Sequence, residues 1–94
     1  MRYIRVHWHH SFPDEPVILF SEIDNDEWER RKVWIFRQGP AGYAGLGETS
    51  RGVELAPVKI QSLAEISADS QFEGQEISEQ EFEEVWTRAH DKSL

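Results

Sequence analysis

Residues 26–36, DEWERRKVWIF, decide the fold, because this stretch fits either a helix capped by Asp26 or a buried β-strand. The four large apolar residues from Val33 to Phe36 favour the strand, since β-branched and aromatic side chains suit a pleated surface. Successive side chains of a strand point to opposite faces. We therefore predict a strand that is apolar on both faces and lies near the centre of a sheet.

The segments before and after this stretch predict further strands. In residues 3–9, apolar side chains at the even positions alternate with mostly polar ones at the odd positions, which is typical of a strand with one buried face. Residues 17–24 (VILFSEID) are β-branched and aromatic enough for another strand. The glycine-rich residues 39–48 should turn the chain, with residues 41–45 as a short fourth strand, and residues 49–60 read as irregular.

Two capping patterns predict helices near the end of the chain. Ser62 with Glu65, and Ser78 with Glu81, match the capping box that marks a helix start. After the second box, an apolar stripe recurs at helical spacing over residues 82–89. We predict an α+β fold in one domain, residues 1–94: an antiparallel sheet of three to five strands from the N-terminal half, with one short and one longer C-terminal helix packed on one face.

Composition narrows the class of protein. The 94 residues include no cysteine, which excludes disulfides, a thiolate nucleophile and cysteine-ligated zinc. No stretch has the apolar length of a signal peptide or a membrane span. We expect a soluble cytoplasmic protein that does not contact membranes.

Charge is unevenly distributed along the chain. The net charge is −8, and residues 48–94 carry eleven Asp and Glu against four Lys and Arg. Eight acids and no base lie between Glu65 and Glu84. Such a run repels phosphate backbones and attracts cations, so we expect no nucleic-acid binding and favour a basic protein partner. The predicted partner-binding acids are Glu73, Glu76, Glu79 and Glu83; a solvated helix face is the alternative. Trp28, flanked by acids, is the candidate for an exposed interface anchor.

The histidine-rich residues 7–10 offer the main alternative chemistry. In a strand, His7 and His9 share a face with Arg5, while His10 points away. Two imidazoles with a cation resemble the minimal set of a metal-independent ribonuclease. Two histidines do not complete a zinc site without a third ligand, such as Asp14, Glu15 or His90, so we predict neither a metal site nor a cofactor. Solvent-facing histidines are the simplest interpretation.

Three stretches resemble a widespread family of small, functionally uncharacterised bacterial proteins: YIRVHWHH (3–10), EIDNDEWERRKVWIFRQGPAGYA (22–44) and LAEISADSQFEGQEISEQEFEEVW (63–86). The shared features fall on Trp28, Glu29, Arg31, Val33, Gly42, Tyr43, Phe72, Ile77, Phe82 and Trp86. The resemblance implies a domain that usually stands alone as a complete protein, and it brings no established activity. Small acidic domains of this build are similar in kind to the immunity proteins that neutralise toxins, which is analogy and not homology.

These observations support one leading hypothesis and two alternatives. The leading one is a non-enzymatic acidic domain that binds a basic protein, such as a toxin, as an immunity-type protein. The second is a small hydrolase or nuclease that uses His7, His9 and Arg5, with or without a divalent metal. The third is a homodimer formed through an exposed sheet edge, so the chain is expected to be a monomer or a homodimer.

Overall fold

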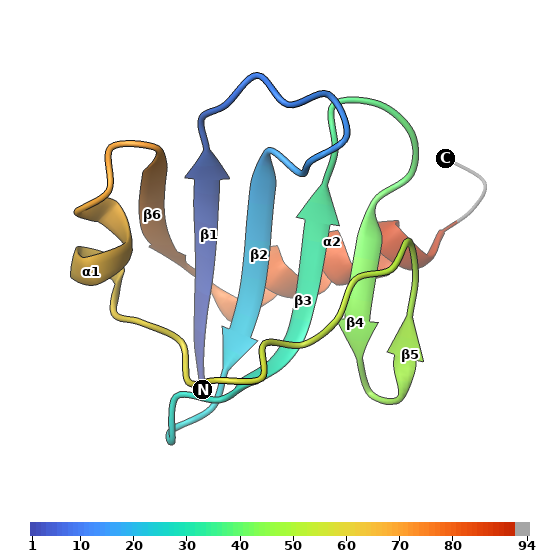
Figure 1. Ribbon diagram of the computed structural model, residues 1–94. Helices are drawn as coiled ribbons and strands as arrows, with labels where there is room; N and C mark the ends of the chain where they lie inside the picture. Colours follow the sequence, from blue (N-terminus) through green and yellow to red (C-terminus); the bar gives the residue numbers. More distant parts are fainter. Residues whose placement is uncertain (92–94) are drawn as a thin grey trace.

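The computed structural model describes residues 1–91 and contains one antiparallel sheet with two helices (Figure 1). Its strands are β1 (Arg2–Trp8), β2 (Ile18–Ile23), β3 (Glu29–Ile35), β4 (Gly42–Gly45), β5 (Glu48–Thr49) and β6 (Phe72–Ile77). The helices are α1 (Leu63–Ser67) and α2 (Glu79–His90). The strand order is β5-β4-β3-β2-β1-β6, and all neighbours are antiparallel. The predicted α+β class is confirmed.

Residues 29–35 of the stretch 26–36 form a strand, as predicted, and residues 26–28 belong to the turn before it. β3 lies inside the sheet, between β2 and β4, and Val33 at its middle is fully buried. β4 is the short strand predicted in the glycine-rich segment and pairs with β3 from Arg31 to Trp34. The segment predicted as irregular, residues 49–60, forms no helix or strand apart from Thr49, which ends β5.

The number of strands exceeds the predicted three to five, because the described chain contains six. Two strands were not predicted individually: the two-residue β5 and the longer β6, which comes from the second half of the chain and lies between the two helices in sequence. β6 is an edge strand that pairs only with β1. An edge position needs fewer apolar side chains than a central one, so the polar sequence FEGQEI forms a strand without the apolar alternation that identifies other strands.

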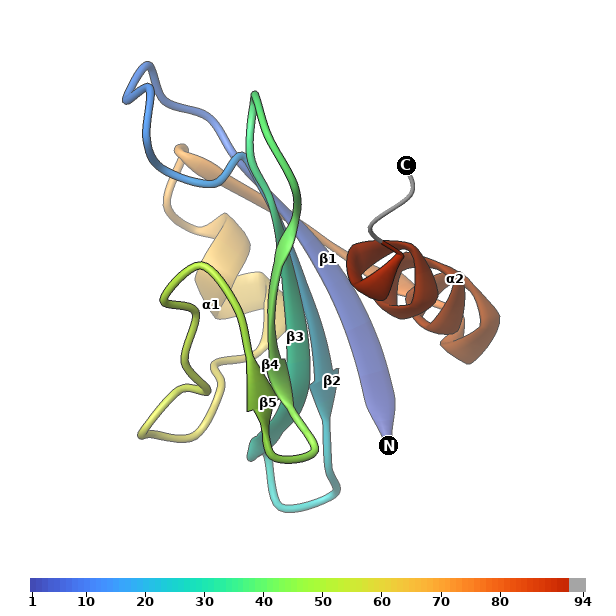
Figure 2. The ribbon, with the colours of Figure 1, turned by 90° about the vertical axis from the view of Figure 1, so that its right-hand side faces the viewer.

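The two helices pack on opposite faces of the sheet, which corrects the prediction of one shared face (Figure 2). On the face covered by α2, the buried core consists of Tyr3, Phe20, Val33 and Phe82. On the face covered by α1, it consists of Ile4, Val6 and Ile23, packed against Leu63 and Ile66 of the helix. Both faces of the central strands are apolar, and each therefore needs its own cover.

Both helices begin where the capping patterns place them. Ser62 and Ser78 are the N-cap residues, and the hydroxyl of each accepts a hydrogen bond from the backbone N–H three residues later. The stripe on α2 packs on the sheet through Phe82, Val85, Trp86 and Ala89. Within residues 1–91, no helix is long and apolar enough to cross a membrane.

Close packing of α1 on the edge strand depends on a glycine. A Cβ atom added to Gly74 of β6 would lie 2.9 Å from Cδ2 of Leu63 on α1. Real Cβ atoms do not approach other carbons so closely, and a larger residue would force the Leu63 side chain to shift. Gly74 thus lets Leu63 of α1 pack closely on β6.

Candidate functional site

The predicted histidine site is only partly assembled. Tyr3, Arg5 and His7 point toward the α2 side of the sheet, but α2 covers only the Tyr3 end of β1. Tyr3 is buried there, so β1 has two buried faces at that end instead of the single one predicted. His7 is half-buried and His9 is exposed, with their rings 6.2 Å apart.

Arg5 is not available to assist the histidines. Its guanidinium donates to the Glu81 carboxylate at 2.6 Å and to the side-chain oxygen of Gln75 at 2.7 Å. His10 lies against Trp8 and hydrogen-bonds the backbone carbonyl of Pro16. Within residues 1–91, no three His, Asp or Glu side chains gather as a possible metal site. The arrangement therefore gives hydrolysis by this face little geometric support.

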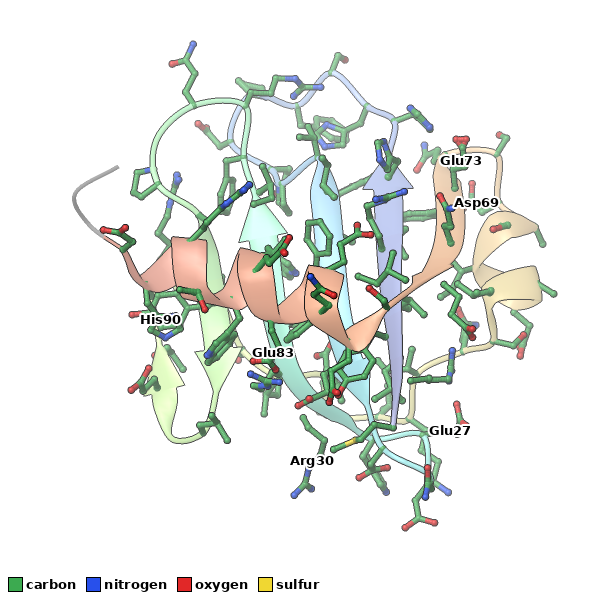
Figure 3. All side chains as sticks on the ribbon, turned by 180° about the vertical axis from the view of Figure 1, so that it is seen from behind. Glu27, Arg30, Asp69, Glu73, Glu83 and His90 are labelled. Carbon is green, nitrogen blue, oxygen red and sulfur yellow. The ribbon has the colours of Figure 1, made fainter. Side chains whose placement is uncertain are left out.

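The acids at the start of α2 face the sheet and have partners there. Glu79 accepts a hydrogen bond from the Tyr3 hydroxyl at 2.9 Å. Glu83 forms an ion pair with Arg31 of β3, and Figure 3 shows Glu83 on the sheet side of the helix. Two of the four predicted partner-binding acids thus contribute to the attachment of α2.

Arg31 is the centre of this attachment. It donates two hydrogen bonds to Glu22 of β2, at 2.8 and 2.7 Å, and its guanidinium lies over the rings of Phe82 and Trp86. The hydrogen bonds from Arg31 hold the pKa of Glu22 below its ordinary value of 4.5, although burial opposes this shift. Burial raises the pKa of the nearby Tyr3 hydroxyl, because a phenolate would be poorly solvated there. The cluster is therefore structural and stays charged at neutral pH.

The other two predicted acids belong to a surface group that we call the acidic edge: Glu65 on α1, Asp69 in the α1–β6 turn, and Glu73 and Glu76 on β6. All four residues are exposed, and Figure 3 labels Asp69 and Glu73 at the β6 end of the sheet. Within residues 1–91, none of the four carboxylates forms an ion pair with a lysine or an arginine. The His9 ring lies 3.9 Å from Glu73. Among the described residues, no lysine or arginine therefore neutralises this group in an ion pair.

The backbone of the β6 edge is mostly occupied. The alternate pairing with β1 turns the N–H groups of Phe72, Gly74 and Glu76 outward. The first donates to the Asp69 carbonyl at 3.0 Å, and the second donates to the Ser67 hydroxyl at 3.1 Å. Two of the three outward N–H groups are thus not free for strand pairing, which weakens the hypothesis of an edge-to-edge homodimer.

Trp28 is exposed, as predicted, but it lies away from Glu73. Its side chain keeps 41% of its surface, and the Lys59 ammonium approaches its ring at 5.9 Å. Trp28 directly precedes β3, at the end of the sheet where Arg2 pairs with Ile23, whereas Glu73 pairs with His7 at the other end of β1. A contact that includes Trp28 and Glu73 would have to span the length of the sheet.

A second group of charges, which the sequence analysis did not single out, lies on the α1 face. Lys32 of β3 places its ammonium 2.9 Å from Glu29 and donates to the backbone carbonyl of Glu54 at 2.8 Å. Glu29 also accepts hydrogen bonds from the Ser21 hydroxyl and the Ala56 N–H. The Glu29 and Lys32 side chains retain only 3% and 9% of their surface. This buried pair ties the irregular segment after β5 to the sheet.

A β-bulge produces this arrangement. Glu22 pairs with Arg31, yet the next residue, Ile23, pairs with Glu29, so Arg30 is an extra residue in β3. Without the bulge, Glu29 and Arg31 would share a face. With it, Glu29 joins Lys32 on the α1 face while Arg31 points to α2.

These charged residues line an open cleft of about 330 Å³ between α1 and the sheet, which we call the α1 cleft. Its floor holds Ser21, Glu29 and Lys32, and its rim holds Glu65 and Asp69 of the acidic edge. The walls are apolar and come from Ile4, Val6, Leu19, Trp34, Ile66 and Phe72. A mostly apolar cleft with a few convergent polar groups is the usual form of a ligand site.

Comparison with known proteins identifies a family but not an activity. Residues 2–91 match the family model described as a domain of unknown function, DUF6881. The chain belongs to this family. The match covers the sheet and both helices, and thus includes the acidic edge and the α1 cleft. Neither a curated protein nor a solved structure matches the chain.

Proposed function

We propose that this chain is a non-enzymatic domain that binds a basic protein, and that the partner docks on the acidic edge. The observation that carries the proposal is the difference between the two sets of acids in the second half of the chain. Glu79, Glu81 and Glu83 are held by side chains of the sheet, whereas within residues 1–91 no lysine or arginine forms an ion pair with the acidic edge. A surface of like charge without a lysine or arginine partner attracts a partner of opposite sign.

The form of the interaction follows from the exposure of the edge. Exposed carboxylates mainly accelerate encounter with a cationic surface and fix its orientation, while apolar contacts nearby supply most of the affinity. A basic toxin, for which this chain would be the immunity protein, has the required charge. The hydrolase hypothesis receives less support, because the guanidinium of Arg5 is already engaged by Glu81 and Gln75.

Affinity capture with matched baits tests the proposal. The wild type, a Glu73→Lys/Glu76→Lys variant and a Glu54→Lys/Glu84→Lys control are each exposed to host-cell lysate at low salt and then eluted with a salt gradient. Both variants change the net charge equally, and the control acids are exposed and lie outside the acidic edge. A basic protein recovered by the wild type and the control, but lost with the first variant, supports the proposal. Equal recovery by all three baits contradicts it.

A further inference from the structure

The α1 cleft has unused hydrogen-bonding capacity at its floor. A lysine ammonium has three N–H donors. Lys32 directs one to Glu29 and one to the Glu54 carbonyl, so one donor is left. The Ser21 hydroxyl donates to Glu29 at 2.7 Å, and its oxygen keeps lone pairs that accept hydrogen bonds. The floor thus offers one donor and one acceptor to a group that enters the cleft.

The walls and rim of the cleft impose two further requirements on an occupant. Trp34 and Phe72 provide aromatic surface, and the Lys32 ammonium already lies over the Trp34 ring at 5.0 Å. An apolar body is therefore favoured against the walls. At the rim, Glu65 and Asp69 add two negative charges, while Glu29 and Lys32 cancel each other at the floor. Positive charge is favoured outside the cleft and not at its base.

We propose that the α1 cleft receives a tyrosine side chain from a basic segment of the partner, an inference that rests on the proposed binding function. The phenol ring packs against the apolar walls. Its hydroxyl accepts from Lys32 and donates to Ser21. Basic residues beside this tyrosine then meet the rim acids and the rest of the acidic edge.

Other side chains fit the cleft less well. The charged head of a lysine or an arginine would meet the Lys32 ammonium at the floor, where like charges repel. A phenylalanine fills the walls but displaces water from Lys32 and Ser21 without replacing its hydrogen bonds. A tyrosine satisfies the walls and the floor together, and tyrosine is among the residues most often found as interface anchors.

Peptide binding followed by two-dimensional NMR tests this assignment. The probes are acetylated and amidated KRYRK, KRFRK and KRARK, each titrated into the isotopically labelled full chain. We expect KRYRK to bind about tenfold more tightly than KRARK, with the phenylalanine peptide between them. The shifts with KRYRK should centre on the Trp34 indole and the amides of Ile66 and Phe72.

Two variants separate the floor from the rim. Ser21→Ala removes one of the two hydrogen bonds to the phenol, so it should lower the affinity for KRYRK toward that for KRFRK and leave the affinity for KRFRK unchanged. Glu65→Gln/Asp69→Asn keeps the capping hydrogen bonds of both residues and should weaken all three peptides about equally. The control Glu54→Gln/Glu84→Gln should change none of the affinities. The NMR spectrum of each variant shows directly whether the chain is folded.

The outcomes distinguish this inference from the proposed function. Equal affinity for KRYRK and KRARK, with shifts confined to β6 and the α1–β6 turn, overturns the cleft assignment and leaves the acidic edge as the docking surface. Binding of neither peptide also overturns the cleft assignment, and the capture experiment then judges the acidic edge by itself. A tyrosine preference that Ser21→Ala does not alter overturns the role given to the floor.

Discussion

Arg31 and Lys32 are consecutive residues of β3, and their cationic groups form buried ion pairs on opposite faces of the sheet. Arg31 is held by Glu22 of β2 and fastens α2 through Glu83, while Lys32 and Glu29 hold the irregular segment after β5 and form the floor of the α1 cleft. One short stretch of β3 thus organises both layers that cover the sheet.

Replacing Arg31 should destabilise the fold strongly. Arg31→Met leaves the Glu22 carboxylate buried without a cation, and breaking a buried pair from one side costs about 3 kcal/mol or more. Urea denaturation measures the loss in the free energy of unfolding. The double variant Glu22→Gln/Arg31→Met removes both charges and should recover part of the loss. A cost below about 1 kcal/mol for the single variant would show that the pair is not important for stability.

Stability should also depend on pH through Glu22. Because hydrogen bonds from Arg31 lower its pKa in the folded state, the folded chain releases this proton more readily than the unfolded chain. The stabilisation is complete above the ordinary pKa of 4.5 and is lost as pH falls through the folded-state value. Denaturation curves from pH 7 to pH 3 test this. Glu22→Gln should flatten the dependence, and an unchanged slope in that variant would contradict the assignment.

Glu29 should keep the irregular segment after β5 ordered on the sheet. Glu29→Ala removes the acceptor of the Ala56 N–H and leaves Lys32 buried without its carboxylate. We expect the Ala56 amide to exchange with solvent at least about tenfold faster, as measured by hydrogen exchange. Glu54→Ala, a change to an exposed acid in the same segment, is the control and should leave the exchange rate unchanged. Equal exchange rates of the Ala56 amide in Glu29→Ala and Glu54→Ala would contradict the view that Glu29 holds this segment on the sheet.

The buried charges explain why part of this structure was not predictable from sequence. Local patterns identified β1 to β4 and both helix starts, because apolar alternation and capping boxes involve neighbouring residues. The strand β6 lacks alternation, and its pairing depends on β1, some 70 residues earlier. The bulge at Arg30 reverses the face of Glu29 relative to the regular alternation, so no spacing rule could place it beside Lys32.

The arrangement of the helices did leave a signal in the sequence. Val33 and Ile35 face α2, while Trp34 faces the α1 cleft, and a strand that is apolar on both faces requires cover on both.

The candidate site was predicted in part. Glu73 and Glu76 are exposed as expected, whereas Glu79 and Glu83, which also keep much of their exposure, bind Tyr3 and Arg31 beneath α2. The partners of a surface acid cannot be read from its own segment.

The β6 edge should resist self-association as long as its backbone stays occupied. Ser67→Ala/Glu76→Val frees the Gly74 N–H and removes a charge from the same strand. Sedimentation velocity should show a monomer for the wild type and a concentration-dependent dimer for the variant. The two-residue β5 at the other edge is too short to support pairing. A stable wild-type dimer would contradict this view of the edge.

The rate of association with the captured basic protein tests the central claim most directly. At low salt, Glu73→Lys/Glu76→Lys should slow association about tenfold relative to the wild type and to Glu54→Lys/Glu84→Lys, because exposed charges act mainly on encounter. The difference should vanish at high salt, where exposed charges are screened. Equal association rates for the wild type and the acidic-edge variant at low salt would contradict docking at the acidic edge.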